Sequence, residues 1–290
     1  MLGLDGADRH GNATRRAALI ATLLRMFGSD SEDEEDEEIR PVSNGVMAFH
    51  NGTEEAMFLY AQRRGIEGDL GVFDAIDEFC MKRHWMMHAG GPKRTILADV
   101  LRNLPEFASI GCLNILELGS YCGYSSSFFA SLLQEREADG HIVCVEPEAK
   151  CVEWTSRMHR LVGVDSYTTV LPTAVSALTS TTMNKDFLER VKATEKAPFQ
   201  VLFIDHDKSK YLTDLKLLRK HGVLAEGCVV IADNVLSFNE PLDEYLDYVR
   251  REAQSSFQYD TRVEYSEVQI ESDPKGEAYY KDALEVSRLS

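Results

Sequence analysis

From residue 111 onward, short apolar runs alternate with longer stretches whose apolar residues recur at helical spacing. The short runs are rich in β-branched residues and almost continuously apolar, which is typical of parallel strands buried on both faces. The stretches between them, such as 125–136 and 150–161, predict helices that form right-handed crossovers. This pattern predicts an α/β fold built on a Rossmann-like, doubly wound, mostly parallel sheet. The predicted strands are residues 113–118, 142–146, 167–171, 201–205 and 228–233.

The two ends of the predicted domain follow other patterns. Residues 52–104 have helical spacing that is broken by Gly90-Gly91-Pro92, which predicts extra N-terminal helices. Residues 261–270 and 277–285 alternate polar and apolar positions around the turn sequence at 273–276. That alternation predicts a C-terminal antiparallel hairpin on the sheet edge. With the five parallel strands, the hairpin makes a seven-stranded sheet.

Residues 1–50 are predicted to be an appendage, and residues 51–290 a single folded domain. The appendage holds a short apolar segment at 17–24 and a run of eight acids within 30–38. Like charges repel along such a run, so we expect a disordered tether. The apolar segment predicts a loosely attached terminal helix, with organelle targeting as the alternative. No apolar stretch approaches the roughly 20 residues that span a bilayer, so we expect a cytoplasmic protein.

Composition narrows the classes of function. The 290 residues carry a formal net charge of −17, and an acidic surface disfavours nucleic acid, whose phosphates require a basic face. The six cysteines form no CxxC pair, so we interpret them as reduced thiols and not as a disulfide or zinc framework. We expect a monomer that acts on a small molecule.

Polar residues follow the first two predicted strands, at the edge where doubly wound sheets bind ligands. Gly119 and Gly123 stand in a strand-to-helix turn, and two glycines there let the backbone approach a ligand closely. The G-x-x-x-G spacing alone is weak evidence, and a turn without a ligand is the alternative. Glu146 ends the second strand, where a carboxylate can accept hydrogen bonds from the ribose hydroxyls of an adenosine ligand. The alternative is an exposed acid at a strand end.

The fourth and fifth strands end in a second group of polar residues. Their neighbouring ends bring together Asp205, Asp233 and Asn234, two carboxylates and an amide oxygen that suit Mg²⁺. Helix capping by each acid is the alternative, but it does not explain the whole set. Lys208 stands beside this group, where a dication and burial disfavour the ammonium form, so it is a candidate general base. Its alternative is a solvated lysine, such as Lys210.

At these residues the sequence resembles the catechol O-methyltransferase family, class I enzymes that use S-adenosylmethionine and Mg²⁺. The resemblance rests on residues 116–125, 203–208 and 232–235, with 75–80 and 84–87 similar to the helical start of the family, and it extends from about residue 52 to the end. It implies a methyltransferase domain over 51–290 that methylates a hydroxyl of a catechol. The combination of motifs is specific, although each motif alone is not.

The resemblance also implies a role for each matching position. Asp205, Asp233 and Asn234 match the magnesium ligands, and Lys208 matches the general base. Substrate contacts are implied for Trp85, Lys208, Asn234 and Glu267, the last as the carboxylate that binds the second catechol hydroxyl. Cofactor contacts are implied for Met87, Ala89, Glu117, Gly119, Tyr121, Gly123, Ser125, Glu146, Ser176, Asp205 and His206, although packing alone is the alternative for His206.

Three departures from the family concern the acceptor and the adenine. Asp207 replaces the usual tryptophan between the histidine and lysine of the fourth-strand motif, and 236–239 replaces a proline-bearing gate. Val175 stands where the family has a serine, with Ser176 next to it. These changes leave open another vicinal diphenol as acceptor, and a binding protein that has lost catalysis. An NAD-dependent oxidoreductase would explain the glycine turn and Glu146 but not the acids at 205 and 233.

Overall fold

The computed structural model describes residues 52–84, 86–108, 112–137, 139–175, 181–236, 242–251, 260–269 and 279–289. The predictions for residues 1–50, including the terminal helix and the acidic tether, lie outside these residues. So does the turn predicted at 273–276.

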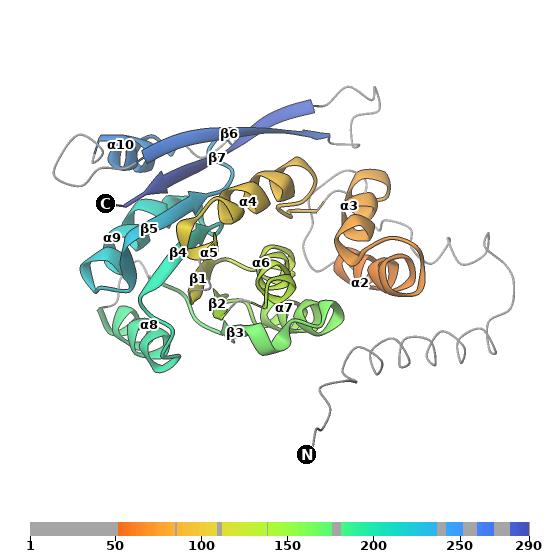
Figure 1. Cartoon of the computed structure of the whole chain (residues 1–290), viewed down its shortest axis with the longest axis horizontal. Helices are drawn as coiled ribbons and strands as arrows, with labels where there is room; N and C mark the ends of the chain where they lie inside the picture. The colour runs from red at the N-terminus through yellow and green to blue at the C-terminus, as the bar shows by residue number, and fades with distance from the viewer. Residues whose placement is uncertain are drawn as a thin grey trace, which may run out of the picture.

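The core of the fold is a seven-stranded sheet in the order β3-β2-β1-β4-β5-β7-β6 (Figure 1). The first five strands pair in parallel, and β7 is antiparallel to both β5 and β6. This topology confirms the predicted doubly wound sheet with a C-terminal antiparallel pair. The strands are β1 (Leu113–Leu118), β2 (Gly140–Val145), β3 (Thr168–Leu171), β4 (Phe199–Ile204), β5 (Leu224–Ala232), β6 (Asp260–Gln269) and β7 (Tyr279–Arg288).

Helices cover both faces of the sheet, which explains why the strand sequences are apolar at consecutive positions. Leu116 and Leu118 of β1 pack in one layer, while Leu113 and Ile115 pack in the other. The first layer includes α8 (Thr181–Ala193), α9 (Tyr211–Lys220) and α10 (Asp243–Arg251). The second includes α4 (Pro92–Arg102), α5 (Pro105–Ala108) and α6 (Tyr124–Glu135).

The extra N-terminal helices form a third apolar cluster beside the sheet, next to α6 and α7 in Figure 1. Met57 and Phe79 from these helices belong to the same buried cluster as Trp154 and Met158 of α7. Pro92 begins α4, as expected for a residue without an N–H in the first helical turn. The remaining helical elements are α2 (Thr53–Tyr60), the π-helix η2 (Ala61–Glu67), α3 (Val72–Lys82), α7 (Ala149–Val162), and the 3-10 turns η3 (Asp165–Tyr167) and η4 (Lys208–Lys210).

The six cysteines are all free thiols, and all except Cys112 are buried. The five buried thiols pack within the fold, and no disulfide joins any of the six. Within the described ranges, no helix has the length and apolar character needed to cross a bilayer.

The ladder of the parallel sheet continues one residue past the strand ends. The amide N–H of Gly119 donates to the Val145 carbonyl, that of Asp205 to Leu118, and that of Asp233 to Ile204, each at 2.9 Å. Gly119 has φ +86°, and a Cβ atom there would lie 2.5 Å from the carbonyl oxygen of Asp205. Only glycine combines this backbone conformation with this close approach. The ends of β1, β4 and β5 therefore form one continuous edge.

Gly119→Ala is expected to destabilise the fold more than the matched change Gly163→Ala. Both glycines have positive φ, but nothing lies within 4 Å of a Cβ at Gly163. Gly163→Ala should cost about 1–2 kcal/mol for the left-handed backbone. Gly119→Ala should cost ~1–3 kcal/mol more, because the end of β4 must move. Urea unfolding measures both variants, and equal losses would contradict the close approach.

Candidate functional site

The turn after β1 surrounds a fully buried carboxylate, Glu117. The Ser125 hydroxyl donates to Glu117 Oε1, while Oε2 accepts no hydrogen bond from the described residues. Burial raises the pKa of Glu117 to about 7, although Ser125, Cys144 and Ser126 act in the opposite direction. A buried carboxylate oxygen without a partner is costly, and a ligand that carries an N–H or O–H group would relieve that cost.

Glu146 holds the same turn from the end of β2. Its Oε2 accepts the backbone N–H groups of Ser120 and Tyr121, both at 3.1 Å, and its Oε1 accepts the N–H of Glu148 at 3.0 Å. Tyr121 has φ +46°, a strained conformation for an aromatic residue, and Gly123 has φ +76°. The carboxylate thus stabilises a turn whose backbone is open to a ligand, and lone pairs on Oε1 remain for further donors.

A second loop approaches this turn from the N-terminal side. Asp77 of α3 accepts the N–H of Gly91 at 3.0 Å, the hydroxyl of Tyr124 at 2.7 Å and the Nε2 of His88 at 3.1 Å. His88 Nδ1 lies 3.2 Å from the Met86 carbonyl oxygen, so both ring nitrogens face acceptors. Burial lowers the pKa of His88, but Cys80 and Asp77 outweigh it and raise the pKa to about 10. At neutral pH the charged His88 ring therefore holds the loop in place through its contacts with Asp77 and Met86.

That loop carries Met87 and Ala89, two of the expected cofactor contacts. Met87 is exposed and Ala89 is buried. Tyr121, a third, donates its hydroxyl to Glu54 Oε1 at 2.9 Å, which ties the glycine turn to α2. The structure thus places Tyr121 in the turn, together with Glu117, Gly119, Gly123, Ser125 and Glu146.

The ends of β4 and β5 bring Asp205, Asp233 and Asn234 together. Ile204 and Ala232 are register partners, so Asp205 and Asp233 follow side by side. Burial and the negative charge of Asp233 raise the pKa of Asp205 well above its usual range, with Lys93 and Lys208 opposing. Two adjacent acids shift in this way when they lack sufficient positive charge between them.

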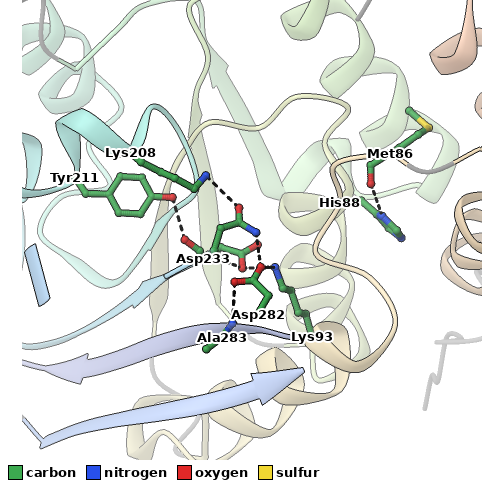
Figure 2. A network of polar contacts seen from close by, with 9 residues as sticks. Met86, His88, Lys93, Lys208, Tyr211, Asp233, Asp282 and Ala283 are labelled. Carbon is green, nitrogen blue, oxygen red and sulfur yellow. Dashed lines mark hydrogen bonds and ion pairs between the residues drawn. The ribbon is translucent and has the colours of Figure 1, made fainter. Parts of the chain in front are cut away.

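Sequence reasoning missed a buried ion pair beside these acids (Figure 2). Lys93 Nζ of α4 lies 2.5 Å from Asp233 Oδ1 and 2.7 Å from Asp282 Oδ2 of β7. Lys93 is 3% exposed and Asp282 is fully buried. Burial alone would lower the pKa of Lys93, but the two carboxylates outweigh it and raise the pKa. Burial likewise would raise the pKa of Asp282, but Lys93 and Asn234 hold it below its usual range.

Two weak signals in the sequence could have indicated this pair. Lys93 is a cation in the first turn of a helix, where the macrodipole favours acids. Asp282 precedes the apolar residues Ala283 and Leu284 of a strand that is buried on both faces. Neither signal identifies the partner, because 189 residues separate the two side chains.

The carboxylate and amide oxygens at this edge that lack a close hydrogen-bond donor are of the kind that binds a hard cation. Among the described residues, none donates a hydrogen bond to the Asp205 carboxylate or to Asp233 Oδ2. Asn234 Oδ1 has a single long contact, with Lys208 Nζ at 3.4 Å. Carboxylate and amide oxygens are the ligands that Mg²⁺ prefers. The described residues contain no cluster of three or more His, Cys, Asp or Glu side chains that could hold a metal.

The two lysines after β4 differ in their partners. Lys208 Nζ reaches Asn234, whereas Lys210 Nζ pairs with Asp207 at 3.0 Å on the outer side of the turn. His206 turns its Nε2 to the buried Asp214 at 2.8 Å and stacks on Tyr211. His206 Nδ1 accepts or donates no hydrogen bond within the described part of the chain, so one ring nitrogen stays available to a ligand.

Several expected substrate contacts fall where little is described. Trp85, Ser176 and residues 237–239 of the altered gate lie outside the described residues. Glu267 lies in β6 opposite Lys281, but its side chain is not among those described. Leu236, at the start of the gate, is exposed.

Comparison with known proteins places this site in a family. A family model described as a methyltransferase domain matches residues 116–235. The chain is 30% identical to the catechol O-methyltransferase of Bos taurus over 255 residues, covering 86% of this chain and 85% of the relative. It is 31% identical to the Mus musculus catechol O-methyltransferase over 235 residues, covering 79% of each. It is 27% identical to the human transmembrane O-methyltransferase over 199 residues, covering 68% of this chain and 62% of the relative.

One solved structure supports the fold alone. It is that of a Staphylococcus aureus protein provisionally assigned as a caffeoyl-CoA O-methyltransferase, with a TM-score of 0.50 and 15% identity. The match covers 82% of this chain and 99% of that structure. The sheet topology, the polar strand ends and the identity to two curated relatives agree, and this chain belongs to the catechol O-methyltransferase family.

Proposed function

We propose that this protein transfers a methyl group from S-adenosylmethionine to one hydroxyl of a catechol, in a reaction that depends on Mg²⁺. Another vicinal diphenol is the alternative acceptor, because the substitutions at Asp207 and 236–239 fall where the family forms its gate. The observation that carries the proposal is the convergence of Asp205, Asp233 and Asn234 at one sheet edge, with Lys208 in contact with the same amide.

The donor half of the proposed site lies next to this edge. Only the backbone of Gly119 lies between the donor half and the cation half of the proposed site, because Gly119 packs against the carbonyl group of Asp205. Glu117 Oε2 is the buried acceptor that would receive the amino group of the methionine part of the donor. Glu146 would receive the ribose hydroxyls through Oε1.

The residues of this chain then divide the chemistry of methyl transfer. S-adenosylmethionine would supply an activated sulfonium methyl, and Mg²⁺ held by Asp205, Asp233 and Asn234 would supply positive charge for the acceptor oxygens. Lys208 would take the proton of the reacting hydroxyl, and this oxygen would accept the sulfonium methyl, with the neutral thioether S-adenosylhomocysteine as the leaving group. The expected role of Glu267 is to accept the hydrogen bond of the second hydroxyl. The site chiefly orients the reactants.

Lys208→Ala should lower kcat by about 10²- to 10⁴-fold, the usual contribution of a positioned general base. Binding of S-adenosylmethionine, measured by calorimetry, should stay close to wild type because Lys208 contacts the cation side of the site. The control is Lys210→Ala, a lysine two residues away that pairs with Asp207 instead. A kcat near wild type in Lys208→Ala at neutral pH would remove the lysine from the mechanism.

Removal of divalent cations should abolish turnover. Lys93 and Lys208 only partly offset the charge of the two acids, and an ionised acceptor would add to that charge, so EDTA should stop methyl transfer and added Mg²⁺ should restore it. The assay uses a panel of catechols and other vicinal diphenols, with and without Mg²⁺. Undiminished activity in EDTA would exclude the metal, and inactivity over the whole panel would favour the binding-protein alternative.

Calorimetry should distinguish S-adenosylmethionine from nicotinamide cofactors. We expect saturable heat with S-adenosylmethionine and none with NADH, because the turn has the G-x-x-x-G spacing and the neighbouring acids have no role in hydride transfer. Glu117→Gln should weaken this binding without altering the response to Mg²⁺. Saturable binding of NADH instead would overturn the choice of donor.

A further inference from the structure

The proposed chemistry leaves two buried charged residues without a role, Lys93 and Asp282. They lie on α4 and β7, on the opposite side of Asp233 from Lys208 (Figure 2). Burial of an ion pair costs desolvation free energy for both partners, so its presence beside a ligand set calls for a structural or functional reason.

Asp282 fixes the orientation of the Asn234 amide. Its Oδ1 accepts the N–H of Ala283 at 2.8 Å, and its Oδ2 accepts Asn234 Nδ2 at 2.6 Å. An ionised carboxylate only accepts hydrogen bonds, so the NH₂ group of Asn234 must face it and the oxygen must face the other way. Asn234 Oδ1 accordingly faces Lys208, on the side where a cation would bind.

Asn234 also adopts the left-handed backbone conformation, with φ +56°. Asparagine tolerates this conformation better than most residues. The conformation changes the direction of the chain directly after Asp233. The N–H of Asn234 donates to Asp233 Oδ1 at 2.7 Å. The same carboxylate oxygen contacts Lys93, which leaves Oδ2 for a cation.

Lys93 balances the charge that Asp282 adds. Asp205, Asp233 and Asp282 together would carry three negative charges at one edge, and the Lys93 ammonium reduces the total to the two charges that one dication neutralises. Without Lys93, three carboxylates would face one dication, and the buried group would keep an uncompensated negative charge.

We propose that Lys93 and Asp282 are positioning residues for the cation site: Asp282 aims the Asn234 oxygen at the cation, and Lys93 holds Asp233 and offsets the charge of Asp282. This inference rests on the proposed function, since it concerns the same three ligands. It assigns the residues an effect on metal affinity that acts through Asn234 and Asp233 and involves no contact with substrate.

The test measures Mn²⁺ binding by electron paramagnetic resonance, without acceptor or turnover, on the full chain. Asp282→Leu removes the carboxylate that accepts from Ala283, Asn234 and Lys93. The Asn234 amide then loses the acceptor that holds its NH₂ group, so its oxygen is no longer held toward the cation. The Kd for Mn²⁺ should rise about 10- to 100-fold, while S-adenosylmethionine binding by calorimetry stays unchanged.

A matched control lies on the same strand. Glu285 is fully buried and pairs with Arg250 at 2.7 Å, on the α10 side of the sheet. Glu285→Leu should reduce stability and leave Mn²⁺ affinity unaltered. Equal weakening of Mn²⁺ binding by both variants, or wild-type affinity in Asp282→Leu, would overturn the inference.

The double variant Lys93→Met with Asp282→Leu separates charge from orientation, and it also reports if the single variant fails to fold. It restores the total of two negative charges but not the acceptor that aims Asn234, so its Mn²⁺ affinity should stay low. Recovery of wild-type affinity would overturn the orienting role of Asp282. Absence of Mn²⁺ binding in the wild-type protein would instead overturn the metal-dependent function itself.

Discussion

The site depends on the parallel pairing of β4 with β5, which places two acids side by side at a sheet edge. Asp205 and Asp233 follow register partners, and their amide groups continue the ladder of the sheet. Rotation of either strand about its axis would turn its carboxylate into a core layer, so the apolar residues before each acid fix its direction. The packing of the core therefore also sets the positions of the two acids. Burial and the neighbouring charge of Asp233 then raise the pKa of Asp205.

The surroundings of these acids supply positive charge at two levels of exposure. Lys93 is enclosed between α4 and β7 and contacts Asp233 directly. Lys208 is only partly buried and reaches the group through the oxygen of Asn234. The enclosed lysine has a raised pKa and stays charged as a fixed part of the scaffold. The partly buried lysine keeps access to solvent, as the proposed general base requires.

The sequence predicted the sheet well because a buried parallel strand has a recognisable local pattern, a short continuous run of apolar residues. Residues 113–118 were predicted as a strand and form β1, and the polar strand-end residues lie where the ladder ends. Lys93 and Asp282 have no comparable pattern, because each is a single charged residue in an otherwise ordinary helix or strand. Their pairing requires the position of β7 against β5, which a strand pattern does not specify. The role of His206 also required the fold, because its partner Asp214 lies on the following helix.

The backbone contact between Gly119 and Asp205 bears on how such proteins diverge. No side chain lies between the glycine turn and the end of β4, so a change of side chain at this contact cannot reshape the site without moving the backbone. Adaptation to new acceptors is therefore expected in the loops, where Met87 and Leu236 are exposed. Relatives with different preferences should share this backbone contact and vary in the loops.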